Sequence, residues 1–241
     1  MHDHVICNII FNHLFPRHFS PICLTFLLMG FSATAQAAHF CVNTVAQLQN
    51  ALTTAATNGA DDVIRVRTGI YLLTQRLVFD SSEAFDLTLE GGYLGVTCAN
   101  QSINPSLTVL DGDDQTPLLT ATSRSATGNL TIRNFTWRNG WGGGSNSPVI
   151  IGANLDGPGD SGTTTVEWNH FRDNHSEQVS TLNSVISISS GRGNLKVRNN
   201  LFAHTSNTTN GAGVAVMIKG VRIENSSTTL SSRRPVPQAM H

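Results

Sequence analysis

Three carboxylates on one short segment have types and spacing that could do chemistry. Asp111, Asp113 and Asp114 follow an apolar run, with Gly112 between the first two. Carboxylate oxygens on a turn are typical Ca²⁺ ligands, but Ca²⁺ takes six to eight oxygens, at roughly 2.3–2.6 Å, so other segments would have to contribute. An Asp-Gly pair is equally typical of an ordinary tight turn. We expect the turn and predict no metal ligand.

The other polar and aromatic candidates are isolated in the sequence. His170, His175 and His204 lie among turn-forming residues without a fixed Asp or Ser partner, so we interpret them as turn residues rather than catalysts. Trp141 is the tryptophan best placed to stack on a sugar ring. The glycine-rich stretch that it opens, and that of Asp156–Gly162, do not join a strand to a helix, so neither is a phosphate-binding loop. We predict no catalytic residue.

The composition excludes several classes of protein. The chain of 241 residues has 15 basic and 16 acidic residues, a net charge of −1, and only 13% charged residues. An average domain has roughly 25%. This balance provides no basic surface for nucleic acid and no attraction to anionic membranes. Hydrophobic residues at 39%, together with abundant Asn, Ser, Thr and Gly, are typical of a secreted, β-rich protein without a cofactor.

Residues 1–37 have the pattern of a signal peptide. The short uncharged apolar run Ile22–Phe31 follows the basic residue Arg17, and Ala35 and Ala37 supply the small residues of a cleavage site. A run of about ten residues is too short to cross a bilayer. A buried N-terminal helix is the alternative. We expect a secreted or cell-surface protein that has no membrane span after cleavage.

Cys41 and Cys98 are the cysteines that remain after this segment. Export to an oxidising compartment favours a disulfide between them. Their spacing lacks the CxxC pairs of a zinc site, which makes a metal site the weaker alternative. The bond would close a loop of roughly 58 residues, worth about 4 kcal/mol in the chain-entropy model.

One segment has helical periodicity. Apolar residues recur three, six, seven and ten positions after Val45, and Thr44 is a suitable N-cap. We predict an N-terminal cap at residues 38–59 that contains this helix. The rest of the chain consists of short alternating apolar runs separated by Gly, Asn, Asp and Ser, which predicts strands of three to five residues.

The strand segments repeat along the chain. Leu130–Trp137, Thr164–Phe171 and Leu195–Phe202 share an apolar third residue and an aromatic end, and Val221–Asn225 matches their first half. The matched positions 132, 166, 197 and 223 are 34, 31 and 26 residues apart, within the range of solenoid repeats. Because no helical segment lies between them, residues 60–226 are expected to form stacked coils of short strands, about 4.8 Å apart.

Stacked coils predict two columns of side chains. Asparagine tolerates the left-handed backbone of a turn, and its amide can stack on the asparagine of the next coil. The turn column comprises Asn134, Asn199 and Asn225. Trp168 interrupts this column. The inward aromatic column, three positions later, comprises Trp137, Phe171 and Phe202.

Several short motifs follow one another along the chain: Phe40-Cys41-Val42 before the helix, Ile64–Tyr71, a Gly91-Gly92 turn before Cys98, Thr108–Gly112, and the repeated Asn-x-x-Phe turns. In the order of these motifs, over about residues 41–225, the chain resembles the secreted right-handed parallel β-helix proteins of the pectin-lyase-like superfamily. The resemblance implies an all-β fold: a right-handed parallel β-helix of about seven rungs with an N-terminal capping helix. In such a fold, further Ca²⁺ oxygens for Asp111 would come from neighbouring rungs about 22 residues away, near Glu90 and Asn134.

The catalytic motifs of the superfamily are incomplete in this sequence. The hydrolases resemble one another in Asn-Thr-Asp, Gly-His-Gly and Arg-x-Lys motifs. This chain has no Asn-Thr-Asp, and Gly191-Arg-Gly193 and Arg222-Ile-Glu224 lack the His and the Lys. We therefore expect a non-catalytic adhesive or glycan-binding protein. The alternative is a polysaccharide lyase or glycoside hydrolase whose active residues lie in a missing part.

The last residues show no strand pattern. Residues 227–241 are polar and rich in Ser, Thr, Arg and Pro, which predicts a disordered tail. An uncapped last rung would then expose a sheet edge that invites association. The expected partners are a polysaccharide or a cell-surface glycan.

Overall fold

The computed structural model describes residues 37–124, 127–143, 147–153, 162–177, 184–191, 193–207, 214–219, 222–224 and 228–231. These ranges are mostly β-structure in four sheets whose main strands run parallel. They contain one α-helix, α2 (Val45–Ala55), and one short 3₁₀ helix, η3 (Pro105–Leu107). The expected all-β class with a helix near the start is therefore confirmed.

The four sheets are labelled A to D. Sheet A contains, in spatial order, β1 (Ala38–Val42), β2 (Asp62–Arg67), β5 (Leu87–Leu94), β9 (Leu130–Arg133), β13 (Thr163–Glu167), β17 (Asn194–Arg198) and β21 (Arg222–Glu224), and β6 (Asn100–Gln101) pairs antiparallel with β5. Sheet B contains β3 (Gly69–Leu72), β7 (Thr108–Asp111), β10 (Thr136–Arg138), β14 (His170–Arg172), β18 (Asn200–Ala203) and β22 (Thr228–Ser231). Sheet C contains β4 (Leu77–Ser81), β8 (Leu119–Ser123), β12 (Val149–Ala153), β16 (Ser184–Ser189) and β20 (Val214–Lys219). Sheet D contains β11 (Trp141–Gly143), β15 (His175–Glu177) and β19 (Ser206–Asn207).

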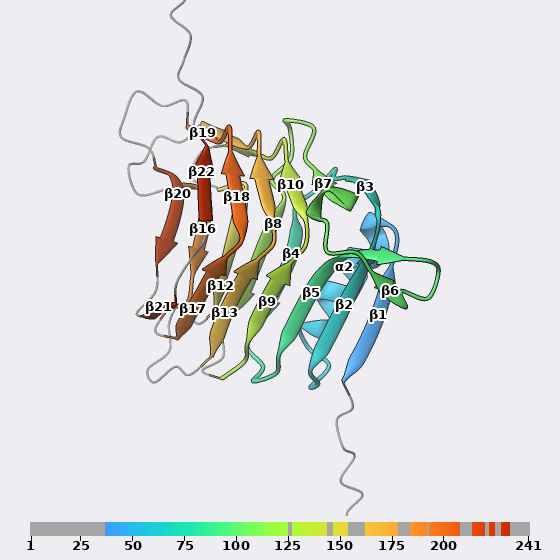
Figure 1. Ribbon diagram of the computed structural model, residues 1–241. Coiled ribbons are helices and arrows are strands. Elements are labelled where there is room, and N and C mark those ends of the chain that lie inside the picture. Colours follow the sequence, from blue (N-terminus) through green and yellow to red (C-terminus); the bar gives the residue numbers. More distant parts are fainter. Residues whose placement is uncertain are drawn as a thin grey trace, which may run out of the picture. The chain divides into compact units, whose positions relative to one another are not determined.

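Within each sheet the parallel strands follow one another in chain order (Figure 1). The chain therefore passes through the sheets repeatedly, and we call one passage a circuit. The first circuit is β2, β3 and β4, and the second is β5, β7 and β8. The third, fourth and fifth circuits each add a strand of sheet D and run from β9 to β12, from β13 to β16 and from β17 to β20. Residues about 30 positions apart thus become neighbours in space.

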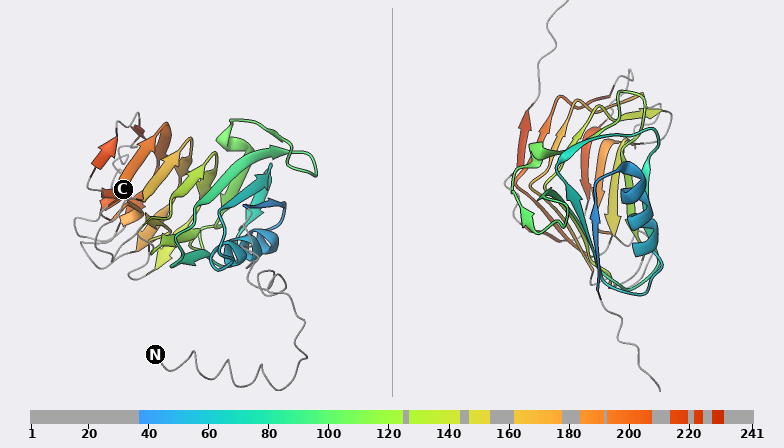
Figure 2. Two further views of the ribbon diagram at one scale, coloured as in Figure 1. Left: turned by 90° about the horizontal axis from the view of Figure 1, so that it is seen from below. Right: turned by 90° about the vertical axis from the view of Figure 1, so that its right-hand side faces the viewer.

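Helix α2 lies at the start of the stack, against β4, β1 and β2 (Figure 2). The Thr44 side chain accepts a hydrogen bond from the Gln47 N–H, as its N-cap position predicts. The apolar stripe of the helix, Leu48, Ala51, Leu52 and Ala55, is buried. The Gln49 amide also donates to the Val78 carbonyl (3.0 Å) and accepts from the Val78 N–H (2.9 Å), so it closes the free edge of β4.

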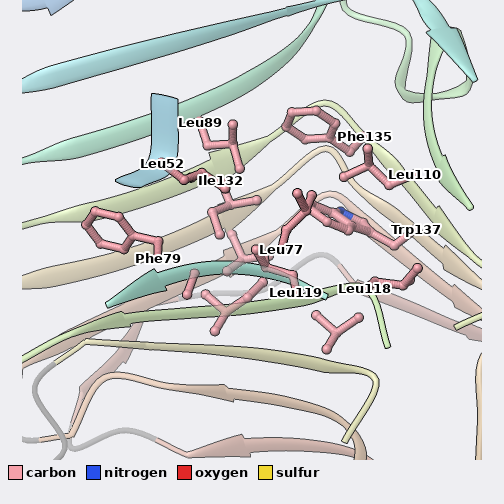
Figure 3. Close-up of a cluster of buried hydrophobic side chains, with 14 of the residues drawn as sticks. Leu52, Leu77, Phe79, Leu89, Leu110, Leu118, Leu119, Ile132, Phe135 and Trp137 are labelled. Atoms are coloured by element: carbon pink, nitrogen blue, oxygen red, sulfur yellow. The ribbon is translucent and has the colours of Figure 1, made fainter. Parts of the chain in front are cut away.

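Inward side chains form register-matched columns through the circuits. Sheet A contributes Ile64, Leu89, Ile132, Val166 and Val197, all of them fully buried. Leucine and phenylalanine side chains of sheets B and C meet this column in the interior (Figure 3). Burying each such side chain stabilises the fold by about 1.5–3 kcal/mol.

The three aromatic residues expected at one inward site do stack. Trp137, Phe171 and Phe202 are register-matched in sheet B and almost completely buried. The ring centroids are 6.2 Å apart for Trp137 and Phe171 and 4.9 Å apart for Phe171 and Phe202, with nearly parallel planes. Phe135 packs against Trp137, with their ring centroids 5.2 Å apart, and widens this column in the third circuit.

The turn column has the predicted backbone but not the predicted amide stack. Asn134, Trp168 and Asn199 all have positive φ, at 67°, 56° and 55°. The Asn134 amide donates to the carbonyls of Gly91 and Ser102, both at 2.7 Å, rather than to another asparagine. The tryptophan of the intervening circuit separates the two asparagines, and Asn225 lies outside the described residues.

Three asparagines at other positions bridge consecutive circuits, and we call them the asparagine clamps; the amides of two of them, Asn169 and Asn200, also bond to each other at 3.2 Å. Each clamp accepts a hydrogen bond from a backbone N–H of the preceding circuit and donates to the carbonyl three residues before that N–H. An asparagine side chain thereby takes the place of a backbone peptide and carries the sheet ladder through the turn. The clamps are Asn169 (Phe135 N–H, Ile132 carbonyl), Asn174 (Gly140 N–H, Trp137 carbonyl) and Asn200 (Asn169 N–H, Val166 carbonyl).

Strand β5 runs through Gly91 and Gly92, where the sequence predicted a turn. A Cβ on Gly91 would meet the Asn134 carbonyl, and one on Gly92 would meet the Ser102 carbonyl. Gly92 also has a φ of +88°. The two glycines therefore allow close approach of other backbone segments, and the turn comes later, between β5 and β6.

The Cys41–Cys98 disulfide is present, with a Cα–Cα distance of 5.7 Å. It joins β1 to the hairpin formed by β5 and β6. The predicted pairing is confirmed.

Part of the segment predicted to be a disordered tail is a strand. Thr228–Ser231 form β22, whose four residues pair in parallel with Asn200–Ala203 of β18. Residues 1–36, which contain most of the expected signal peptide, and residues 232–241 lie outside the described residues. No helix within the described ranges is long and apolar enough to cross a membrane.

Candidate functional site

A row of alternating charges crosses the outer face of sheet A. Register-matched positions hold Arg65, Glu90, Arg133, Glu167 and Arg198, one from each of the five circuits. The Glu90 carboxylate accepts from the Arg133 Nε at 2.9 Å, and Glu167 accepts from the Arg198 Nε at 2.6 Å. Weaker pairs at 3.7 Å join Arg65 to Glu90 and Arg133 to Glu167. The row is thus one ion-pair network.

Tyr93 completes the environment of Glu90. Its hydroxyl donates to the Glu90 carboxylate, and the Arg65 guanidinium lies 5.4 Å from its ring centroid. Burial, and then the hydrogen bond and charge of Glu90, raise the pKa of Tyr93 to about 12. Both Glu90 carboxylate oxygens therefore accept hydrogen bonds, one from Tyr93 and one from Arg133, so that Glu90 links Tyr93 to the ion-pair network.

The acidic turn does not converge on a cation site. The buried Asp111 carboxylate accepts from Arg138 (2.7 Å), from the Asn139 amide (2.9 Å) and from the Asp113 N–H (3.0 Å). Burial raises the pKa of Asp111, but these hydrogen bonds outweigh it and hold the pKa below its usual value. Its oxygens therefore serve the turn itself.

The further oxygens expected from Glu90 and Asn134 lie elsewhere. Glu90 is register-matched to Arg65 and Arg133 in sheet A, whereas Asp111 is matched to Leu72 and Arg138 in sheet B. The Asn134 Nδ2 donates to the Gly91 and Ser102 carbonyls, so its side chain lies against β5, and its Oδ1 is buried without a hydrogen-bond partner among the described residues. Across the described ranges, no group of three or more His, Cys, Asp or Glu side chains is arranged to hold a metal ion.

Two histidines have acidic partners that the sequence did not reveal. The Nδ1 of His204 lies 3.1 Å from Asp173, and the Nδ1 of His175 lies 3.5 Å from Asp114. Each pair joins consecutive or near-consecutive circuits, so the partners are about 30 to 60 residues apart in the chain, beyond the reach of local sequence patterns. His170 points outward from sheet B, where burial and then the charge of Arg172 lower its pKa.

Trp141 lies beside one of these pairs. It is register-matched to His175 in sheet D and is partly exposed. The six-membered ring of its indole fills the space that a Cβ on Gly143 would need. The absence of a side chain at Gly143 therefore leaves room for the ring to lie along its own strand.

These residues gather where the chain turns from sheet B to sheet D, and we call them the corner face. The corner face comprises Asp114, Trp141, Arg172, Asp173, His175 and His204. Its charged side chains are about one quarter to two thirds exposed. A partly exposed indole next to both acidic and basic hydrogen-bonding side chains can bind a ring-shaped polar ligand.

Comparison with known proteins found no match among protein-family models, curated proteins or solved structures.

Proposed function

We propose that this chain is a secreted or cell-surface right-handed parallel β-helix, similar to the pectin-lyase-like superfamily, that binds a glycan without cleaving it. Parallel sheets that gain one strand per circuit support the β-helix. The Cys41–Cys98 disulfide supports export, because such bonds persist in oxidising compartments.

The arrangement of Trp141 carries the proposal. A sugar ring offers a face of C–H groups to an aromatic ring and hydroxyl groups to polar neighbours. Trp141 offers the ring, held over Gly143, and the adjacent His175–Asp114 pair offers a donor and an acceptor. Trp168 is also 44% exposed, but it occupies a turn next to the asparagine clamps, and the charged residues beside it, Glu167 and Arg198, are paired with each other.

The buried carboxylates support binding over hydrolysis. Glycoside hydrolysis by the common mechanisms uses a carboxylic acid of raised pKa and a second carboxylate about 5–10 Å away. Glu90, Glu167 and Asp111 each accept a hydrogen bond from an arginine, so all three carboxylates are engaged in ion pairs within the fold. This environment suits a structural ion pair better than a proton donor.

The test measures binding of the full chain to a panel of neutral and acidic polysaccharides, with tryptophan fluorescence and affinity electrophoresis as the readouts. Trp141→Ala should weaken binding at least about tenfold, because the stacked ring is lost. Gly143→Ala should weaken it too, because the new Cβ displaces the indole. Trp168→Asn is the matched control, since asparagine occupies the equivalent turn in the third and fifth circuits.

Equal binding by wild type and Trp141→Ala would contradict the corner face as the site. Release of reducing ends or unsaturated products from any polysaccharide would favour the lyase or hydrolase alternative.

A further inference from the structure

Exposed apolar side chains are concentrated in one part of the molecule. Nine large hydrophobic residues are exposed among those the structure describes, and eight of them lie between positions 70 and 107. The eight are Ile70, Leu72, Val78, Phe85, Leu94, Val96, Ile103 and Leu107. Between positions 108 and 206 the described residues add only Trp168. Soluble proteins rarely gather exposed apolar residues in this way unless they mark a contact surface.

Strand β3, which begins sheet B, lies in this part. It pairs with β7 on one side and has no strand of the described ranges on the other. The Leu73 N–H donates to the Asp111 carbonyl of β7, and peptide groups along a strand alternate in direction. The N–H and C=O groups of Ile70 and Leu72 therefore point to the open edge.

Nothing in β3 protects this edge. Its sequence, Gly-Ile-Tyr-Leu, has no charge and no proline, the usual devices against edge pairing. Ile70 and Leu72 are 67% and 55% exposed on its outer side. The neighbouring edge of sheet C is closed differently, because the Gln49 amide pairs with both backbone groups of Val78.

Further apolar residues lie at the same end of the stack. The hairpin between β5 and β6 extends past β1 at this end (Figure 1). It bears Leu94 and Val96, and Val96 is 80% exposed. The chain then returns to sheet B through Ile103 and Leu107. With Ile70 and Leu72, these exposed side chains add apolar surface at the end of the stack where β3 lies.

We infer that β3 is a docking strand for a second copy of this chain. Two β3 strands pair antiparallel across a twofold axis, so that the two copies of sheet B join into one continuous sheet. A twofold contact is self-complementary, and like charges on two short edge strands paired across the axis would repel, whereas β3 carries no charge. Pairing satisfies the backbone groups of Ile70 and Leu72 and buries both side chains against those of the other copy.

The test measures the oligomeric state of the full chain by sedimentation equilibrium and amide exchange at several concentrations. We expect a dimer, with the amides of Ile70 and Leu72 increasingly protected as concentration rises. The double variant Ile70→Lys/Leu72→Lys should weaken dimerisation at least about a hundredfold, because lysines on the edge strand oppose each other across the axis. Val78→Lys is the matched control, since Val78 is exposed on the adjacent strand whose edge Gln49 closes, and it should dimerise like wild type.

A chain that stays monomeric up to about 0.1 mM, with rapid exchange at Ile70 and Leu72, would overturn the inference. So would a dimer that tolerates the double lysine variant, or an edge occupied by a different protein while this chain remains monomeric.

Discussion

The first two circuits and the next three are built on the same sheets but held together differently. Circuits three to five include sheet D, the asparagine clamps and the aromatic column. The first two circuits are secured from outside their repeat, by α2, the Cys41–Cys98 disulfide and the β5–β6 hairpin. They also carry nearly all of the exposed apolar residues described.

The difference shows what a repeat needs in order to close on its own. A clamp residue satisfies the turn of the circuit before it, so each circuit of the periodic part stabilises its predecessor. Among the described residues, the first two circuits receive no such clamp from the circuit that follows them. They depend on a helix that supplies one amide, Gln49, and on a covalent cross-link.

The largest effect is expected in the aromatic column. Phe171→Ala should destabilise the fold by about 3–5 kcal/mol, because it opens a cavity between Trp137 and Phe202. Chemical denaturation should show the loss, and amide exchange should rise first in circuits three to five. Val78→Ala is the control, since that side chain is 43% exposed and lies outside the inferred β3 contact, so its removal should change stability by less than about 0.5 kcal/mol. A uniform rise in exchange along the chain would remove the distinction between the two regions.

Loss of the disulfide should act on the other region. The double variant Cys41→Ser/Cys98→Ser should lose about 2–4 kcal/mol, because the unfolded chain is no longer restrained by the loop. We expect faster exchange in β1, β2 and the β5–β6 hairpin, with the Trp137–Phe202 column still protected. Equal loss of protection around Phe202 would mean that the circuits unfold as one unit.

A clamp variant tests the periodic part directly. Asn169→Ala leaves the Phe135 N–H and the Ile132 carbonyl without their partner in a buried site, and should lose about 2–3 kcal/mol. Thr165→Ala, on the outer face of the same circuit, is the control and should be nearly neutral in thermal denaturation. A neutral Asn169→Ala would show that water replaces the clamp.

The smallest effect concerns the pH dependence of stability at two aspartates whose pKa values are shifted in opposite directions. Burial, only partly offset by the Asn58 hydrogen bond, raises the pKa of Asp62. Its stabilising contribution to the free energy of unfolding is therefore present at low pH and is lost as the pH rises through the folded-state pKa. The lowered pKa of Asp111 gives the reverse: its contribution is present above the unfolded value and is lost as the pH falls through the folded-state pKa. Asp62→Asn should therefore stabilise at neutral pH and Asp111→Asn should destabilise. If both variants changed the free energy of unfolding in the same direction, measured by urea denaturation at pH 7, these two environments would be contradicted.

The sequence alone determined the period and the inward pattern. Ile132, Val166 and Val197 alternate with polar residues, and Trp137, Phe171 and Phe202 follow each at one fixed offset, so their columns could be predicted. The N-cap Thr44 and the Cys41–Cys98 pair were likewise predictable, because local pattern and a count of two leave few choices.

Only the tertiary structure decided which polar atoms meet. The clamps lie at Asn169, Asn174 and Asn200 rather than Asn134, Glu90 pairs with Arg133, and His204 faces Asp173. Each of these contacts joins residues about 30 to 45 positions apart, and a shift of one residue in register would replace every partner. A repeating sequence specifies how often the chain returns, whereas packing of complete circuits fixes where along the next strand it arrives.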